Sequence, residues 1–177
     1  MPIIATAGHV DHGKSTLVRV LTGIDPDRWE EERRRGMTID LGFAFMELPG
    51  GELVSFIDVP GHIRFISNML AGVGGIHGCL FVVDAREGWM PQTDEHLHIL
   101  QFAGLNAGVI AVTKIDQCDA ESLQLTLMDI DERVARTFLH DAVVVPVSAP
   151  SGLGMNALID ALADMTRRTP PSCDRSR

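Results

Sequence analysis

Hydrophobic residues along this chain follow two alternating patterns. Short, nearly continuous apolar runs give way to segments in which apolar positions recur every three or four residues. The runs are typical of buried strands, and the spaced segments are typical of helices that cover one face of a core. Their alternation predicts an α/β fold in which helices cover both faces of a mostly parallel sheet. The predicted strands are residues 3–7, 41–48, 53–59, 79–84, 109–113 and 143–147.

The predicted helices carry their apolar residues on one face. One helical pattern runs through residues 17–21. Another is expected to begin at Thr93, because a threonine followed by Asp94 and Glu95 is typical of a capped helix start, and to stop at Gly104. Two further helical faces consist of Leu123, Leu127, Ile130 and Val134, and of Met155, Leu158, Ile159, Leu162 and Met165.

The second and third predicted strands are joined by a very short connection. Only Pro49-Gly50-Gly51-Glu52 separates them. Four residues suit a hairpin, whereas a parallel crossover needs a dozen or more. We therefore expect a six-stranded sheet with one antiparallel strand.

The length of 177 residues suits one core and is too short for two ordinary domains. We expect a nucleotide-binding domain over residues 1–169. Pro170 and Pro171 should end the last helix, so residues 170–177 are predicted to be an interdomain linker or a truncated tail.

Charge and cysteine content limit the partners and the cellular location that can be expected. The net charge of −9 argues against broad adhesion to nucleic acid or anionic membrane. Any RNA contact would be local; Arg28 with residues 33–35 either forms it or lies in a solvated loop. The three scattered cysteines suggest neither a disulfide framework nor a zinc site. With no signal peptide or membrane span expected, the predicted location is the cytoplasm.

Residues 8–15 fit the phosphate-loop pattern GxxxxGK[ST] at every fixed position. They lie between a predicted strand and a helix, which is the context that the motif requires. Lys14 would reach the β- and γ-phosphates, and the Ser15 hydroxyl would bind Mg²⁺. The predicted phosphate-binding residues are His9, Val10, Asp11, His12, Gly13, Lys14, Ser15 and Thr16.

Two further segments fit a site that senses the γ-phosphate. Asp58 ends a strand, where it could hold Mg²⁺ through a water, and the Gly61 N–H could contact the γ-phosphate. Thr38 could complete the Mg²⁺ shell and order its loop in the triphosphate state. His62 could orient the attacking water and accept its hydrogen bond. We therefore predict His62, Lys14 and Gly61 as the catalytic set.

Guanine recognition is predicted at two later strand ends. The Asp116 carboxylate can accept hydrogen bonds from N1–H and the exocyclic amine of guanine, whereas N1 of adenine is an acceptor. The stem of Lys114 would lie along the base plane, and Thr113 opens the motif in place of the more usual asparagine. After the next strand, Ser148-Ala149 could offer an N–H to the guanine O6.

With these motifs assembled, the chain resembles the GTPase domains of the elongation factor Tu group. Residues 8–15, 35–42 and 58–62 carry the resemblance, which extends from Ile3 to about Met165. Within the group the chain is most similar to the selenocysteine-specific elongation factors, through residues 40–42 and 68–76.

The resemblance implies a Ras-like fold, a Mg²⁺-dependent GTPase stimulated by the ribosome, and a monomeric domain. It implies that Val10 and Met37 form an apolar gate beside His62. Members carry aminoacyl-tRNA to the ribosome, and the resemblance to the selenocysteine-specific factors implies selenocysteinyl-tRNA as the cargo. Following β-barrel domains hold the tRNA, and a C-terminal extension reads an mRNA signal.

Two alternatives stay open at this point. The cargo could be a general aminoacyl-tRNA or an initiator tRNA, because the residues that select it lie outside this chain. The domain could also be a nucleotide-gated binding module with negligible hydrolysis.

Overall fold

The computed structural model describes residues 1–26, 42–58 and 76–169, with only the backbone of Asp58 included. The predicted tail, residues 170–177, lies outside the described residues. Within the described part of the chain, no helix combines the length and the apolar character that crossing a bilayer requires.

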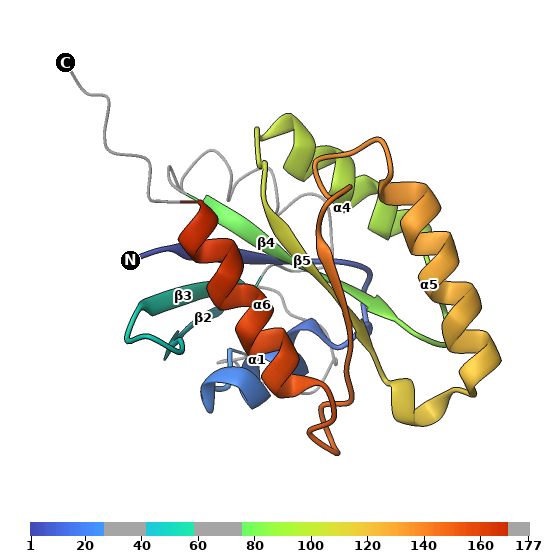
Figure 1. Ribbon diagram of the computed structural model, residues 1–177, viewed down its shortest axis with the longest axis horizontal. Helices are drawn as coiled ribbons and strands as arrows, with labels where there is room; N and C mark the ends of the chain where they lie inside the picture. Colours follow the sequence, from blue (N-terminus) through green and yellow to red (C-terminus); the bar gives the residue numbers. More distant parts are fainter. Residues whose placement is uncertain (27–41, 59–75, 170–177) are drawn as a thin grey trace.

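A six-stranded sheet organises the described residues (Figure 1). All neighbouring strands pair in parallel except β2 and β3, which are antiparallel, so the predicted fold class is confirmed. The order across the sheet is β2 (Gly42–Glu47), β3 (Leu53–Asp58), β1 (Ile3–Ala7), β4 (Ile76–Asp84), β5 (Gly108–Thr113) and β6 (Val143–Pro146).

The connection between β2 and β3 forms the predicted hairpin. The Leu48 N–H donates to the Glu52 carbonyl at 2.8 Å, and the Gly51 N–H donates to the Leu48 carbonyl at 3.0 Å. Gly50 and Gly51 have φ values of 110° and 85°, a region that favours glycine. The two glycines therefore allow a turn that is too tight for most other residues.

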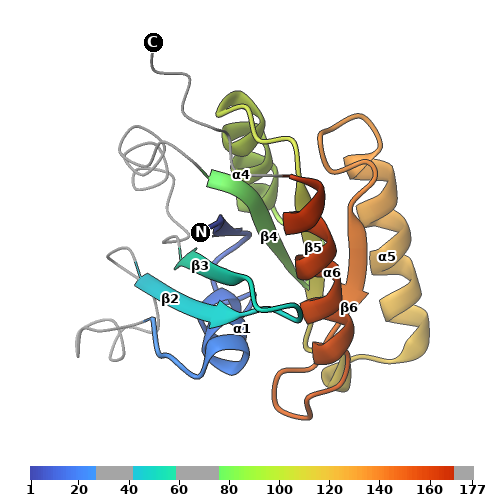
Figure 2. The same ribbon diagram turned by 60° about the vertical axis from the view of Figure 1, so that its left-hand side comes forward.

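Helices cover both faces of the sheet, as Figures 1 and 2 show. On one face α1 and α6 contribute Leu17 and Leu158 to a core shared with Val82 of β4. On the other, α4 and α5 contribute Leu100 and Ile130 to a second core. The helices are α1 (Lys14–Thr22), α4 (Pro91–Phe102), α5 (Ala120–Val134) and α6 (Met155–Arg168), with a 3₁₀ turn η1 (Ile115–Gln117).

Several predicted boundaries differ from the structure; β2 ends at Glu47 rather than at residue 48, and β5 begins at Gly108 rather than at residue 109. Helix α4 begins at Pro91 rather than Thr93, because a proline at the first helical position lacks only an N–H that would be unpaired there. The Thr93 hydroxyl instead accepts from the Met90 N–H at 3.2 Å, inside the first turn. Strand β4 begins three residues before Cys79, at Ile76, and β6 ends at Pro146.

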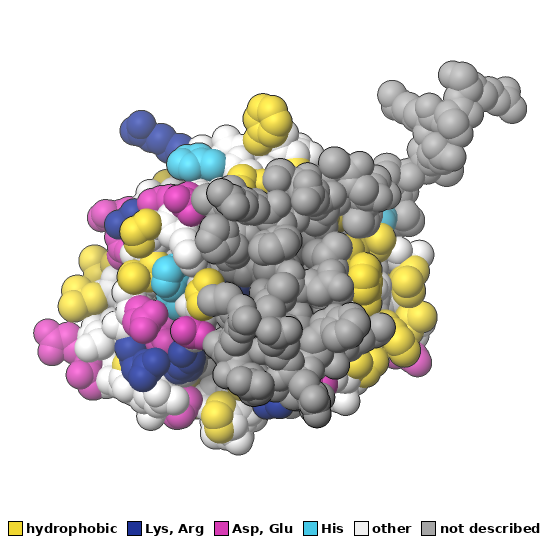
Figure 3. All heavy atoms as spheres, turned by 180° about the vertical axis from the view of Figure 1, so that it is seen from behind, with side chains coloured by type: hydrophobic (Ala, Val, Ile, Leu, Met, Phe, Trp, Pro, Cys, Tyr) yellow, Lys and Arg dark blue, Asp and Glu magenta, His cyan; other side chains and the backbone are white. Residues whose placement is uncertain are grey.

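The edge strand β2 has one covered face. Ala44 is buried, whereas Phe43 and Phe45 are 44% and 57% exposed. On the neighbouring strand, Leu53 is also exposed. Figure 3 shows hydrophobic side chains gathered on the side where β2 and β3 lie. Alternate residues of a strand point to opposite faces: Ala44 packs into the core that contains Leu17 of α1, and Phe43 and Phe45 lie on the opposite face of β2.

Candidate nucleotide-binding site

The loop between β1 and α1 depends on backbone shapes that few residues tolerate. Gly8 has φ +132°, and a Cβ there would overlap the Val82 carbonyl oxygen. Gly13 has φ +91° and Asp11 has φ 63°. The loop therefore lies directly against β4, and glycine is required at its first position.

Lys14 reaches back into this loop. Its ammonium donates to the carbonyls of Gly8 at 3.0 Å and of His9 at 2.7 Å, and its side chain is buried. Lys14 is also the first residue of α1, whose first turn carries no acidic residue. A buried cation and a helix N-terminus together favour an anion, so the loop fits the phosphates of a nucleotide.

The donors near α1 also fit magnesium. Ser15 places a hydroxyl, a hard oxygen ligand of the kind Mg²⁺ takes, in the first turn of α1. Asp58, predicted to act through a water, ends β3 beside β1. Ser15 would hold the ion, with Thr38 as the other predicted direct ligand and Asp58 acting through a water.

Helix α4, on the face of the sheet opposite α1, also contacts the phosphate loop. The Gly8 N–H donates to His96 Nδ1 at 2.9 Å, and the Val10 N–H donates to Gln92 Oε1 at 3.2 Å. We did not predict either contact from the sequence. A signal was present, because Gln92 and His96 are four residues apart and so share a face of one helix.

His12 is buried inside the loop. Burial, with a smaller contribution from the charge of His9, lowers the pKa of His12 to about 4. The ring centroids of His9 and His12 are 5.0 Å apart. His12 Nε2 lies 3.2 Å from a carboxylate oxygen of Glu87, without hydrogen-bond geometry to any described residue. His12 is therefore neutral at pH 7.

The predicted base-recognition residues join the phosphate loop directly. The Thr113 hydroxyl donates to the His12 carbonyl at 2.7 Å, and the Lys114 ammonium donates to the Asp11 carbonyl at 2.6 Å. Lys114 has φ 58°, and Asp116 is exposed in η1, immediately after it. Asp116 is thus free of the core and available to a base.

The segment that follows β6 lies beside η1. The Ile115 N–H donates to the Val147 carbonyl at 3.4 Å, which brings the next residue, Ser148, close to the base loop. Ser148 is buried, and its N–H donates to the Leu153 carbonyl at 2.9 Å. Ala149, half-buried, is then the residue with a backbone N–H to offer to a base.

Asp84 is a further member of this region that the sequence analysis missed. It ends β4, is wholly buried, and binds Lys114 with a carboxylate–ammonium distance of 2.8 Å. Burial alone would raise the pKa of Asp84, but hydrogen bonds from Arg86 and Lys114 hold it below its ordinary value. Asp84 is therefore ionised.

Several predicted residues lie outside the described residues. These are Met37 and Thr38, and Gly61 and His62; Arg28 and residues 33–35 lie there too. The predicted apolar gate is described only at Val10. Their proposed roles stay predictions.

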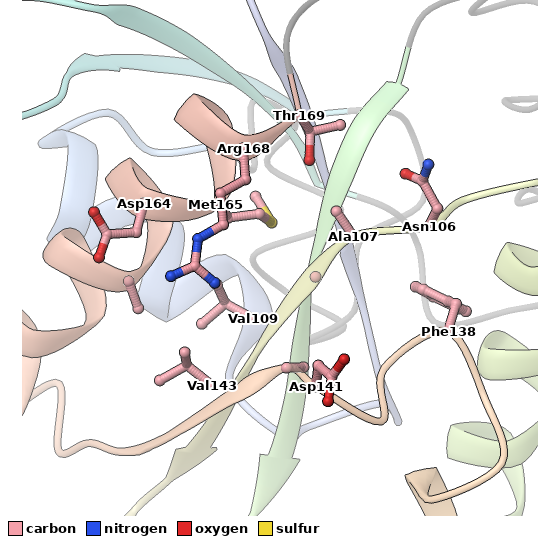
Figure 4. Close-up of a pocket in the computed structure, with 13 residues that line it drawn as sticks. Asn106, Ala107, Val109, Phe138, Asp141, Val143, Asp164, Met165, Arg168 and Thr169 are labelled. Atoms are coloured by element: carbon pink, nitrogen blue, oxygen red, sulfur yellow. The ribbon is translucent and has the colours of Figure 1, made fainter.

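A hollow among the described residues lies away from these loops. It measures about 490 Å³ and is lined by Gly108, Val143 and Arg168, among others (Figure 4). Gly108 and Val143 begin β5 and β6, whereas the phosphate and base loops follow the carboxyl ends of the parallel strands. The hollow is therefore at the opposite edge of the sheet and contains none of the predicted site residues.

The sheet, the glycine-dependent loop and the buried Lys14 define a phosphate-loop nucleotide-binding domain. Residues 1–168 match the model of the elongation factor Tu GTP binding domain. The chain belongs to that family.

Two relatives are selenocysteine-specific elongation factors. That of Desulfomicrobium baculatum is 45% identical over 97% of this chain, and that of Escherichia coli strain K12 is 47% identical over 94%. The chain spans 27% of the length of each. A crystal structure of a bacterial selenocysteine-specific elongation factor, EF-Sec, superposes with a TM-score of 0.88 at 40% identity, covering 96% of this chain and 30% of that one.

Proposed function

We propose that residues 1–169 form the GTP-binding and GTP-hydrolysing domain of a factor that delivers selenocysteinyl-tRNA to the ribosome. The proposal that the cargo is selenocysteinyl-tRNA is supported by the 45–47% identity to selenocysteine-specific elongation factors over nearly the whole chain. Following domains would hold the tRNA and read an mRNA signal, and residues 170–177 would lead toward them. The domain is proposed to act as a cytoplasmic monomer.

The phosphate end of the site would use Lys14 and the loop around it. The ammonium that donates to the Gly8 and His9 carbonyls would turn to the β- and γ-phosphates. Mg²⁺, when bound, neutralises charge on the same phosphate oxygens. Ser15 would hold the ion with Thr38 and, through a water, Asp58.

Hydrolysis would depend on positioning more than on covalent chemistry. The Gly61 N–H would contact the γ-phosphate, and His62 would orient the attacking water. Val10 and Met37 would form an apolar gate that keeps His62 away from the water until the ribosome binds.

The base end would select guanine through Asp116, whose exposed carboxylate accepts two hydrogen bonds from the base. The test is equilibrium binding of GDP, ADP and xanthosine diphosphate to the full-length protein. We expect GDP to bind at least tenfold more tightly than ADP, because loss of a charged hydrogen bond costs about 1.5–3 kcal/mol.

The variant Asp116→Asn should change the preferred base from guanine to xanthine. Its amide can donate to the O2 of xanthine while its oxygen accepts from N1–H, so xanthosine diphosphate should replace GDP as the tighter ligand. Because Asp116 is exposed, the fold should not change. Equal binding of GDP and ADP to the parent protein would contradict guanine recognition.

The cargo is tested with the full-length protein loaded with GTP. Its affinity for selenocysteinyl-tRNA is compared with that for the same tRNA carrying serine and for a bulk elongator aminoacyl-tRNA. A strong preference for the first supports the proposal. Equal affinity for all three would make the protein a general carrier, and no binding would favour a nucleotide-gated module.

A further inference from the structure

Asp84 is a buried acid that no step of the proposed reaction uses. It pairs with Thr113 in the register of β4 and β5, so its side chain lies at the carboxyl edge of the sheet, next to the start of the base loop. A wholly buried carboxylate is costly unless it is paired and hydrogen-bonded. The residues that bind the Asp84 carboxylate therefore indicate its role.

Two cations share the Asp84 carboxylate. Arg86 donates to it from its backbone N–H at 2.8 Å and from two guanidinium nitrogens at 3.3 and 3.0 Å. The Lys114 ammonium lies 2.8 Å from Oδ2. The Arg86 side chain is 41% exposed, whereas that of Lys114 is 25% exposed and turned toward the phosphate loop.

Lys114 connects Asp84 to the phosphate loop. The same ammonium that contacts Asp84 donates to the Asp11 carbonyl at 2.6 Å. Both Asp11 and Lys114 have positive φ, 63° and 58°, which is a strained conformation for residues with a Cβ. A contact that fixes the ammonium therefore helps to hold two strained residues in place, one in each loop.

We infer that Asp84 is a positioning residue for guanine-nucleotide binding, which fixes Lys114 on the Asp11 carbonyl and so holds the base loop against the phosphate loop. This inference rests on the proposed function, because the ligand is the guanine nucleotide. Asp84 contacts neither base nor phosphate in this role. Its effect on binding passes through Lys114.

The test compares four forms of the full-length protein: the parent, Asp84→Asn, Lys114→Met and the double variant. GDP dissociation constants and dissociation rates are measured for each, with thermal unfolding in the absence of nucleotide. We expect Asp84→Asn to weaken GDP binding at least about tenfold, the size of one charged hydrogen bond, mainly through faster dissociation. In the Lys114→Met background the same change should weaken binding less than twofold.

A matched control is Arg86→Met. It removes the other cation on Asp84 but leaves the contact from Lys114 to the phosphate loop, so GDP affinity should stay within about threefold of the parent. Should Asp84→Asn not remain folded, Asp84→Ser, which is smaller and neutral, is measured in the same two backgrounds.

The outcomes separate this inference from the proposed function. Unchanged GDP affinity in Asp84→Asn, or equal losses in both Lys114 backgrounds, would overturn the positioning role while leaving guanine binding intact. Equal losses would mean that Asp84 acts only on the general stability of the fold. Failure of the parent protein to bind GDP would overturn both.

Discussion

Gly8 is the residue whose backbone most constrains the site. Its φ of +132° and its contact with the Val82 carbonyl leave no room for a Cβ. Gly8→Ala should therefore destabilise the fold by about 2–4 kcal/mol and weaken GDP binding, because the phosphate loop must move away from β4. Urea unfolding and GDP titration of the variant measure the two effects.

Gly23→Ala provides the comparison. Gly23 also has a positive φ, +72°, but a Cβ there meets nothing within 4 Å. Only the left-handed conformation would be penalised, at about 1–2 kcal/mol, with GDP affinity unchanged. Equal effects of the two substitutions would show that close packing on β4 is unimportant.

His12 should make stability depend on pH. Its folded pKa of about 4 lies below the ordinary value of 6.5, so the unfolded chain takes up the proton first as the pH falls. The stabilisation is complete above pH 6.5 and should be lost progressively down to about pH 4, by about 3 kcal/mol in total. His12→Gln should show a smaller loss between pH 7 and pH 4 in urea unfolding.

The control for this titration is His98→Gln. His98 is exposed on α4, so its removal opens no buried space. Asp84, whose pKa is lowered, adds a separate loss of stability only as the pH falls below the ordinary aspartate range. A profile for His12→Gln that follows the parent through the whole window would contradict the assignment.

At the scale of elements, α4 acts as a brace for the phosphate loop. His96 is buried and accepts from the Gly8 N–H, so His96→Ala would leave that buried donor unpaired. We expect a loss of about 1–3 kcal/mol in the free energy of unfolding. Glu95→Ala, on the exposed side of the same helix, should change it by less than about 0.5 kcal/mol. Chemical denaturation of the two variants measures both free energies of unfolding, and equal losses would contradict a specific role of His96.

At the scale of the whole molecule, the proposed function places control of hydrolysis in the complex of the full-length protein with the ribosome. His62 lies outside the described residues, so its role rests on the sequence. In the full-length protein, His62→Ala should reduce ribosome-stimulated hydrolysis by about 10²–10⁴-fold, the usual contribution of a positioned base. Single-turnover hydrolysis with and without ribosomes measures it, and GDP affinity serves as the control. A change of less than about twofold would remove His62 from the mechanism.

Much of the fold could be read from the sequence because its signals are local. The predicted connection of four residues between the second and third strands suits a hairpin and is too short for a parallel crossover, and strands and helices each show their own hydrophobic period. The predicted start of α4 was wrong by two residues. Thr93 has a side chain that is typical of a helix cap, but Pro91 is better suited to the first position of the helix. Both residues favour a helix start, and the sequence alone does not show which of the two positions the helix uses.

The order of strands and helices along the chain and the chemistry of the loop around Lys14 could be predicted from the sequence, because spacing along the chain fixes which backbone groups surround a short motif. The contacts of Asp84 with Lys114 and of His96 with Gly8, which join residues 30 and 88 positions apart, are evident only in the folded chain. Those contacts depend on the placement of β4 between β1 and β5, and strand order is set by packing of the whole core rather than by any local pattern.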